Sequence, residues 1–337
     1  MSTSAATAAT AATATPTTHS VGIDIGGTKV AGAVVGDAAR VLAGARADTP
    51  AADPDPEALW SAVAGVLADL LAQASTRGLA IRGVGLSCAG PIDTRAGTVS
   101  PINITGWHGF PLVARVRDVL DEAGRGGLAV HLAGDGTAMA LAEQRHGAAR
   151  GVGDVLGIVV STGIGGGLVL AGRPFGGRTG NAGHVGHVVV DPRGELCTCG
   201  GIGCLETVAS GPSAVRWALA QGWAPSGTGS PTGPPSGSPT GAGLAAAARA
   251  GDPVASAAIA RAGRAVGEAV AGVAATVDLA AVVVGGGFAQ SGEALFGPLR
   301  AAVARHAKLS FLHDLRVTPA ALGVDAGVIG AAALVEA

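Results

Sequence analysis

The sequence predicts an α/β fold made of two related domains. Two segments, 21–35 and 156–170, share one pattern, in which an apolar strand reaches a turn rich in glycine and threonine and a second apolar strand returns. Further strand patterns alternate with helical patterns along the chain, which is typical of α/β proteins. With 337 residues, of which 48% are hydrophobic and 14% charged, the chain is long enough to bury the cores of two domains.

After the first hairpin, the elements follow from their periodicity. The helix start signal Asp-Pro-Glu at 55–57 precedes apolar residues at helical spacing, namely Leu59, Val63, Val66, Leu67 and Leu70. Apolar runs at 80–86 and 127–132 predict two strands, and a helix with one apolar face is expected at 111–122.

The second half contains a segment of different composition. Residues 221–243 are mostly serine, proline, threonine and glycine, which cannot bury enough apolar surface to fix one conformation, so we expect a surface loop. Alanine-rich helices are expected at about 244–276, a buried strand at 280–284 that ends in three glycines, and a last helix near 326–335.

Each hairpin is expected to open one domain. We therefore predict a smaller N-terminal α/β domain from 19–134 together with 324–337, and a larger C-terminal α/β domain at 135–323 that includes the 221–243 loop. Residues 1–18 are rich in alanine and threonine, and we expect them to form a disordered leader.

Charge and hydropathy exclude several classes of protein. The formal net charge is −2 and no basic run occurs, so we expect no nucleic acid partner. Glycine, proline and charged residues interrupt every apolar stretch before the roughly 20 residues that a membrane-spanning helix needs. The first 20 residues lack the charged and apolar regions of a signal peptide, and we expect a cytoplasmic protein.

The turn of the first hairpin reads Asp24-Ile-Gly26-Gly27-Thr28-Lys29. It places a carboxylate at the end of a strand, followed by two glycines that let backbone N–H groups approach an anion, then a hydroxyl and a cation. This set suits a phosphate bound to Mg²⁺. It is not a Walker A loop, because Thr28 stands where that motif needs lysine. An ordinary glycine-rich hairpin turn is the alternative interpretation.

The second hairpin repeats this chemistry with Thr162, Gly163 and Gly165 in Ser-Thr-Gly-Ile-Gly-Gly-Gly at 161–167. A third junction of strand and glycine follows at 284–287 and includes Gly285 and Gly286. Three such loops can surround a nucleotide, with two holding phosphates and one lying against the adenosine. Coincidence of three common turns is the alternative.

Three of the four cysteines lie close together in the sequence. Cys197, Cys199 and Cys204 follow His187, which gives one imidazole and three potential thiolates, the ligand set of a closed structural zinc site. His184 is an alternative imidazole ligand, and buried free thiols are the alternative to a metal site. The clustering indicates a metal and not disulfides.

Asp135 lies between a strand pattern at 129–132 and a helical run at 138–143, with Gly134 and Gly136 beside it. A carboxylate in such a turn can face a cleft and accept a proton from a hydroxyl group. The cap of a helix N-terminus is the commoner role of aspartate in this position and stays open as an alternative.

Taken together, these stretches resemble the ROK family of bacterial sugar kinases and repressors, from about residue 21 onward. The most distinctive part runs from Gly186-His187 through Asp191-Pro192 to Cys-Thr-Cys-Gly-Gly-Ile-Gly-Cys-Leu-Glu at 197–206, which is similar to the zinc and sugar-binding signature of the family. The resemblance implies a two-domain hexokinase/actin-like ATPase fold, ribonuclease H-like, with a structural zinc site. Two domains of this type close over ATP and a sugar.

The resemblance also implies roles for the residues named above. Asp135 corresponds to the catalytic base, which would accept a proton from the 6-OH of a hexose, while Asp24 and the Gly27-Thr28 turn correspond to the Mg²⁺ and phosphate positions. The positions that contact sugar are Asn103, His187 and Glu206, and His187 would also bind the Zn²⁺. A homodimer or a tetramer is expected.

Two departures from the family pattern bear on the substrate. Gly134 replaces the asparagine that usually precedes the base, and His184 replaces the usual glutamate three residues before His187, a variant similar to bacterial N-acetylmannosamine kinases. Because these changes alter the hydrogen bonds offered to the sugar, the expected acceptor is glucose or, alternatively, N-acetylmannosamine, an aminosugar such as kanosamine, or a cyclitol. A non-catalytic sugar sensor and a ROK-type transcriptional regulator are the alternatives from other classes, and the leader has no basic recognition helix.

Overall fold

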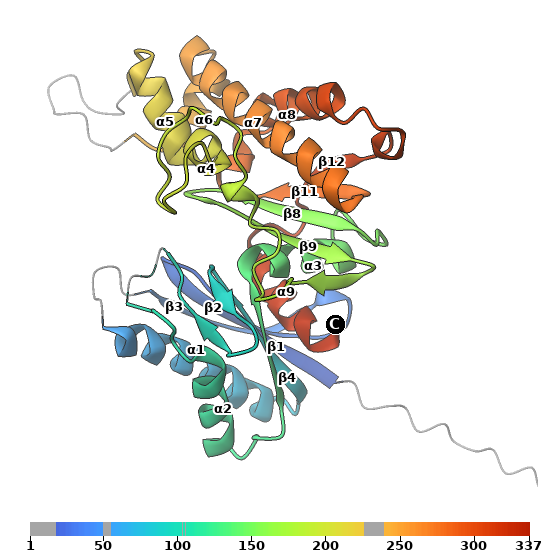
Figure 1. Cartoon of the computed structure of the whole chain (residues 1–337). Helices are drawn as coiled ribbons and strands as arrows, with labels where there is room; N and C mark the ends of the chain where they lie inside the picture. The colour runs from blue at the N-terminus through green and yellow to red at the C-terminus, as the bar shows by residue number, and fades with distance from the viewer. Residues whose placement is uncertain (1–17, 50–54, 103, 105, 226–238) are drawn as a thin grey trace, which may run out of the picture.

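The computed structural model describes residues 18–49, 55–102, 104, 106–225 and 239–337. Two five-stranded sheets lie one above the other, and helices lie between them and on both outer sides (Figure 1). The strand orders are β3-β2-β1-β4-β7 and β10-β9-β8-β11-β12. Both sheets therefore have the same topology, since in each one an antiparallel hairpin with its third strand is followed by two parallel strands. The predicted α/β fold is confirmed, and the strand order of one sheet is repeated in the other.

The central strands of the first sheet are largely buried on both faces. Its strands are β1 (Thr18–Ile25), β2 (Lys29–Val35), β3 (Val41–Asp48), β4 (Ala80–Cys88) and β7 (Ala129–Gly134). Helices α1 (Pro56–Thr76) and α2 (Leu112–Glu122) cover the outer face (Figure 1). Asp55 caps α1 as the sequence predicts, because its carboxylate accepts the N–H of Glu57 at 2.9 Å. A short two-stranded sheet of β5 (Ile92–Asp93) and β6 (Thr98–Val99) follows β4.

Helix α1 corrects one expectation from the sequence. It is long and apolar enough to cross a membrane by length and composition, although we expected no such segment. In the fold, its apolar residues pack into the core of the first half and Asp69 on the opposite side is exposed. A core helix and a membrane span therefore share this composition, and the packing of α1 is that of a core helix.

The second sheet has strands β8 (Val155–Val160), β9 (Ile164–Leu170), β10 (Arg173–Phe175), β11 (Ala281–Gly285) and β12 (Arg316–Pro319). Its outer side is covered by helices α4 (Leu205–Ala209), α5 (Gly211–Ala220), α6 (Gly241–Arg249), α7 (Pro253–Val277) and α8 (Glu293–His306) (Figure 1). The predicted loop at 221–243 is shorter than expected, because α6 begins at Gly241 and Thr240 caps it through the N–H of Gly243. Residues 226–238 lie outside the described part of the chain.

Two helices, α3 (Asp135–His146) and α9 (Ala326–Ala333), lie between the sheets (Figure 1). Helix α9 returns the end of the chain to the first sheet, and a Cβ on Gly22 of β1 would collide with the carbonyl oxygen of Val328. Helix α3 packs on β8 and β9 of the second sheet. The two helices touch where a Cβ on Gly330 would collide with the carbonyl oxygen of Ala138. This helix pair is therefore one of the contacts between the halves.

The remaining predictions differ from the structure in small ways. Helix α3 begins at Asp135, three residues before the predicted helical run, and Thr18, assigned to the leader, is the first residue of β1. The rest of the predicted leader, 1–17, lies outside the described residues.

Candidate functional site

Asp24 lies at the end of β1 with its carboxylate between β4 and α9. The hydroxyl of Ser87 in β4 donates a hydrogen bond to its Oδ1 at 2.8 Å. On the other side, a Cβ added to Gly327 would lie 3.1 Å from Oδ1 and closer still to Oδ2, so the carboxylate packs directly on the first turn of α9. Burial raises the pKa of Asp24, while the Ser87 hydrogen bond and the charge of Lys29 act against that rise. The N-terminus of α9 favours a negative charge at this place.

Asp135 is the first residue of α3 and lies near Asp24. Its Oδ1 accepts the N–H of Gly136 at 2.7 Å, and the cap residue of the helix is Gly134. The alternative role of Asp135 as the helix cap is therefore not the one that the structure shows. Burial raises the pKa of Asp135, and the charge of Asp24 adds to the rise, while the Gly136 hydrogen bond and His184 oppose it. A carboxylate with a raised pKa is the better proton acceptor.

The first glycine turn joins β1 to β2 beside Asp24. The N–H of Gly26 donates to the carbonyl oxygen of Lys29 at 3.0 Å, and Thr49 donates its hydroxyl to the carbonyl oxygen of Gly26 at 2.8 Å. Gly27 is half-buried and Thr28 is exposed at the tip of the turn. The turn is therefore fixed from behind by Thr49, with its tip open to a ligand.

The second glycine turn lies where several elements of the second half meet. Ser161 accepts the N–H of Gly211, the first residue of α5, at 2.9 Å. A Cβ on Gly286, which follows β11 with φ of 97°, would collide with the carbonyl oxygen of Val160. The second glycine turn, with Thr162 and Gly163, therefore lies beside the junction at Gly285 and Gly286.

The glycines of β9 also bring the second half close to Asp135. A Cβ on Gly165 would lie 3.4 Å from Asp135 Oδ1. A Cβ on Gly136 of α3 would collide with the backbone of Gly166, the next residue of β9, and a Cβ on Gly166 would lie 2.6 Å from the carbonyl oxygen of Gly183. Part of this glycine run is thus explained by helix packing, while Gly165 faces the carboxylate.

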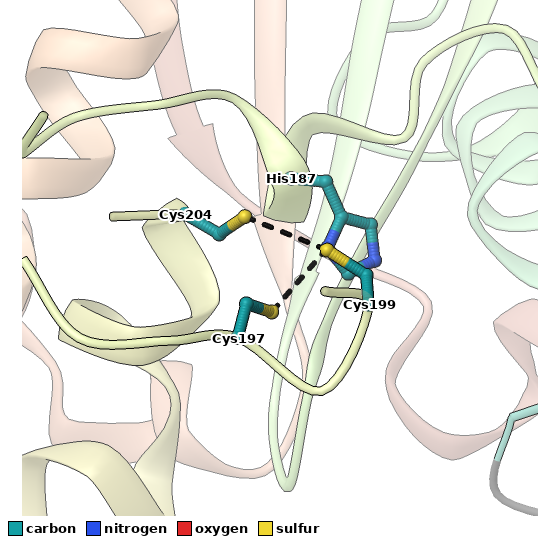
Figure 2. A group of neighbouring side chains, drawn as sticks. All are labelled: His187, Cys197, Cys199 and Cys204. Carbon is teal, nitrogen blue, oxygen red and sulfur yellow. Dashed lines mark hydrogen bonds between the residues drawn. The ribbon is translucent and has the colours of Figure 1, made fainter. Parts of the chain in front are cut away.

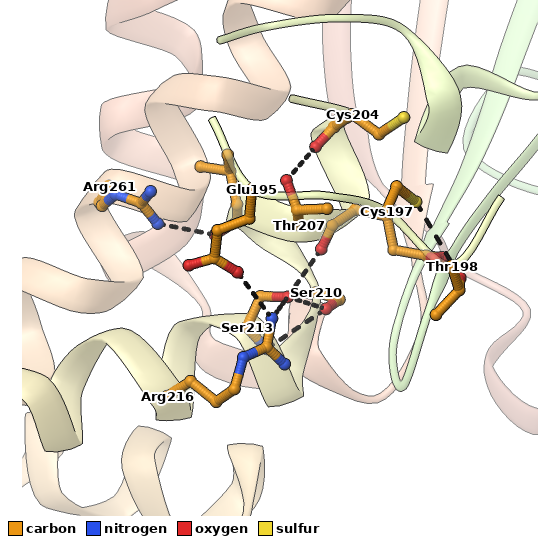
Figure 3. Close-up of polar contacts among 11 residues, drawn as sticks. Glu195, Cys197, Thr198, Cys204, Thr207, Ser210, Ser213, Arg216 and Arg261 are labelled. Carbon is orange, nitrogen blue, oxygen red and sulfur yellow. Dashed lines mark hydrogen bonds and ion pairs between the residues drawn. The ribbon is translucent and has the colours of Figure 1, made fainter. Parts of the chain in front are cut away.

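Glu206 connects the second turn to the cysteine-rich loop. Its Oε2 accepts the N–H of Ile164 at 2.8 Å, and a Cβ on Gly163 would lie 2.7 Å from the same oxygen. The carbonyl oxygen of Glu206 accepts the hydroxyl of Ser213 at 2.8 Å. Figure 3 shows that Arg216 also reaches Ser213 and Glu195, to which it donates at 3.0 and 3.4 Å. This network holds α4, α5 and the cysteine-rich loop in one arrangement.

His187, Cys197, Cys199 and Cys204 form the predicted cluster (Figure 2). Their ligand atoms all lie within 4.8 Å of one another, with 3.8 Å between Cys197 Sγ and His187 Nδ1 and 3.7 Å between the sulfurs of Cys199 and Cys204. All four cysteines of the chain, Cys88 included, are free thiols. Because tetrahedral zinc holds each sulfur about 2.3 Å away, two sulfur ligands of one ion lie about 3.8 Å apart. The four side chains therefore fit a zinc ion.

His184 lies outside this cluster. Its Nδ1 is 2.9 Å from the carbonyl oxygen of Asn181, and its ring centroid is 6.3 Å from that of His187. A Cβ on Gly90 of the first half would lie 2.6 Å from its Nε2. His184 therefore stands between the two halves, where Asn181 also exchanges hydrogen bonds of 2.9 and 2.7 Å with the backbone of Ile92.

Sequence reasoning brought most of these residues together but missed several. One region of the structure contains five of the predicted site residues, Asp24, Asp135, His184, His187 and Glu206. The sixth, Asn103, lies outside the described residues. The residues that hold them, Ser87, Asn181, Ser213 and Gly327, were not predicted. Only Ser87 carried a signal, since it is polar and follows the strand predicted at 80–86. In the structure this strand pairs parallel with β1, so the two strands end at the same edge of the sheet.

Comparison with known proteins places this chain among sugar kinases. The model of the ROK family matches residues 20–337. The chain is 35% identical over 330 residues to a glucokinase of Thermotoga maritima, covering 95% of this chain and 98% of that protein. It is 33% identical over 317 residues to an N-acetylmannosamine kinase of Citrobacter koseri, covering 94% of this chain and 98% of the relative.

A solved structure agrees with these relatives. The crystal structure of a ROK family glucokinase from Streptomyces griseus in complex with glucose and AMPPNP superposes with a TM-score of 0.75 at 34% identity. The match covers 94% of this chain and 98% of that one.

Proposed function

The chain belongs to the ROK family, and from that membership we infer that it transfers the γ-phosphoryl group of ATP to a hydroxyl of a hexose. It is a sugar kinase with the α/β, hexokinase-like fold of that family. The observation that carries the proposal is the pair of partly buried carboxylates, Asp24 and Asp135, each beside a glycine-rich turn, with Asp24 close enough for its charge to raise the pKa of Asp135.

Asp135 is proposed as the base. It accepts the proton of the attacking hydroxyl, by family analogy the 6-OH, as that oxygen bonds to the γ-phosphorus and the bond to the β–γ bridging oxygen of ATP breaks. The transition state of phosphoryl transfer is largely electrostatic, so the residues act by positioning and by compensating charge. A base with a raised pKa keeps enough basicity to take this proton near neutral pH.

The nucleotide site is proposed to lie between the two hairpins. Gly26, Gly27, Thr28 and Lys29 would bind phosphate, and Asp24 would hold Mg²⁺, which neutralises phosphate charge when bound. Thr162, Gly163 and Gly165 would contact the phosphates from the other half. The exposed tip of the first turn and the meeting of the second turn with Gly285 and Gly286 support this assignment.

The sugar is proposed to lie against His184, His187 and Glu206, and Asn103 belongs to the same proposal although it lies outside the described residues. Glucose is the first candidate because the glucokinase of Thermotoga maritima is 35% identical. N-acetylmannosamine is the second, because a kinase of that sugar is 33% identical and His184 stands between the halves. Kanosamine and cyclitols remain candidates that the same assay covers.

A structural zinc site at His187, Cys197, Cys199 and Cys204 is proposed from the fit of their ligand atoms. Burial and Cys199 raise the pKa of the Cys204 thiol to about 12, and a bound cation would reverse this because zinc binds thiolates. The ion would brace the loop that carries His187 and so orient that imidazole toward the sugar.

Three further expectations are part of the proposal. The division into domains at 19–134 with 324–337 and at 135–323 is supported by the two sheets and by the return of α9 to the first one. A cytoplasmic location suits an enzyme with four free thiols. Assembly into a homodimer or tetramer rests on the family resemblance alone.

Release of ADP tests the proposed function. Purified protein is incubated with Mg-ATP and, separately, glucose, mannose, glucosamine, kanosamine, N-acetylmannosamine and cyclitols. We expect turnover with one acceptor well above the hydrolysis rate without sugar. Binding of a sugar without turnover of any acceptor would contradict the kinase assignment and favour a sensor.

A further inference from the structure

Glu143 is a charged residue in the core that the mechanism has not used. It lies in α3 with 0% exposure, and among the aspartate, glutamate, lysine and arginine residues that the structure describes it is the only fully buried one. Its Oε2 accepts the N–H of Ala148 at 2.8 Å, and its Oε1 accepts those of Ala321 and Leu322 at 2.9 and 2.8 Å. No salt bridge reaches it from any described residue.

A carboxylate in this setting is costly, because burial removes its hydration and hydrogen bonds replace only part of it. The three N–H groups belong to two segments that are far apart in the sequence. Ala148 follows α3, whereas Ala321 and Leu322 follow β12 and lead into α9. Glu143 therefore joins α3 to the segment from which α9 starts.

Each of the two segments also reaches one carboxylate of the site, Asp135 or Asp24. Asp135 is the first residue of α3, about two helical turns before Glu143. On the other segment, Gly327 in the first turn of α9 packs against the Asp24 carboxylate. The far end of α9 is held as well, because Arg145, which like Glu143 lies near the C-terminal end of α3, donates to the carbonyl oxygen of Ala333 at 2.7 Å. The helix pair of Figure 1 is thus fastened at both ends of α9.

We propose that Glu143 is a positioning residue for phosphoryl transfer, which fixes the placement of Asp135 relative to Asp24 by fastening α3 to the start of α9. This inference rests on the proposed function. It requires no contact of Glu143 with substrate, since the residue acts through the backbone of the two helices. A shift of about 1 Å between reacting groups lowers rates by about 100-fold. Loss of the hydrogen bonds between Glu143 and the segment before α9 is therefore expected to reduce kcat before it reduces sugar binding.

Two variants perturb the hydrogen bonds of Glu143 in different ways. In Glu143→Gln, an amide has the same shape, but its NH₂ group must face an N–H where the carboxylate accepted a bond. In Gly147→Ala, the carboxylate is retained, but the new Cβ collides with Glu143 Oε2 and displaces it. Gly153→Ala is the matched control, because a Cβ there meets nothing within 4 Å.

The experiment measures kcat and KM for the sugar, sugar affinity by calorimetry, thermal unfolding, and kcat against pH. For Glu143→Gln and Gly147→Ala we expect kcat to fall about 10- to 100-fold, while KM and sugar affinity stay within about twofold and Gly153→Ala matches the wild type. If the carboxylates move apart, Asp24 raises the pKa of Asp135 less, and the acid limb of the kcat profile moves to lower pH.

The possible results distinguish failure of the positioning role of Glu143 from failure of the proposed kinase function. A merely structural role would lower the unfolding temperature and leave kcat and its pH profile unchanged well below that temperature, which would overturn the proposal. An equal rise of KM and loss of sugar affinity would also overturn it. Absence of turnover in the wild type with every acceptor would instead refute the proposed function, and this inference with it.

Discussion

Replacing Gly327 by alanine tests how tightly the Asp24 carboxylate is held. The added Cβ would lie 3.1 Å from Asp24 Oδ1 and closer to Oδ2, whereas ordinary contacts begin near 3.4 Å. Asp24 cannot turn away without cost, because Ser87 donates to Oδ1 at 2.8 Å and the residue is enclosed by β4 and α9. The carboxylate must therefore move by roughly 1 Å from its place.

A displacement of this size at a group that holds Mg²⁺ and phosphate is expected to lower kcat/KM for Mg-ATP by about 100-fold. Sugar affinity measured by calorimetry without nucleotide should stay unchanged, since Asp24 is assigned to the nucleotide. The matched control is Gly272→Ala in α7, where a Cβ meets nothing within 4 Å and alanine stabilises the helix by up to about 1 kcal/mol.

The measurement is steady-state ADP release at varied Mg-ATP with saturating sugar, together with thermal unfolding of each variant. Wild-type kcat/KM in a folded Gly327→Ala protein would refute the assignment of Asp24 to the nucleotide site. If the variant does not fold, Ser87→Ala removes the anchor from the other side without adding volume, and the same loss of kcat/KM is expected in smaller measure.

Two other predictions concern pH and metal. Because burial raises the pKa of Asp135 above the ordinary 3.8, kcat should fall as the pH drops through that raised pKa, and a limb at the ordinary value would contradict the assigned base. Removal of zinc by a chelator, or Cys199→Ser at the exposed ligand, should lower the unfolding temperature and raise the sugar KM with little change in kcat. Thr198→Ala is the control in the same loop. Purified protein that contains no zinc before the chelator is added would contradict the metal site.

The strands and helices that could be predicted are those that bury regular apolar patterns. The hairpin β1–β2 and helix α1 follow this rule, because their apolar residues are buried at the expected spacing. Strand β3 was missed, since it is an edge strand of alanine, glycine and arginine with mostly exposed side chains. Strand β12 was also missed, because it lies at the edge of the second sheet and none of its side chains is buried.

In the candidate site, too, some residues could be predicted from the sequence and others could not. Side chains with distinctive chemistry, such as Asp24 and the cysteines, could be selected from the sequence together with their neighbours. The residues that hold them could not, because their roles depend on tertiary contacts. Glu143 looks like an ordinary polar residue of a helix surface until α3 is packed between two sheets, and Gly327 looks like a helix breaker until Asp24 is placed beside it.

The proton-accepting role of Asp135 is the central claim of the mechanism. The direct test compares the wild type with Asp135→Asn, whose amide has the same shape and cannot accept the proton, by measuring formation of phosphorylated sugar and binding of Mg-ATP and sugar. We expect both ligands still to bind the variant, while the rate of formation of phosphorylated sugar falls by at least about 100-fold. Phosphorylation at the wild-type rate by the folded variant would contradict it.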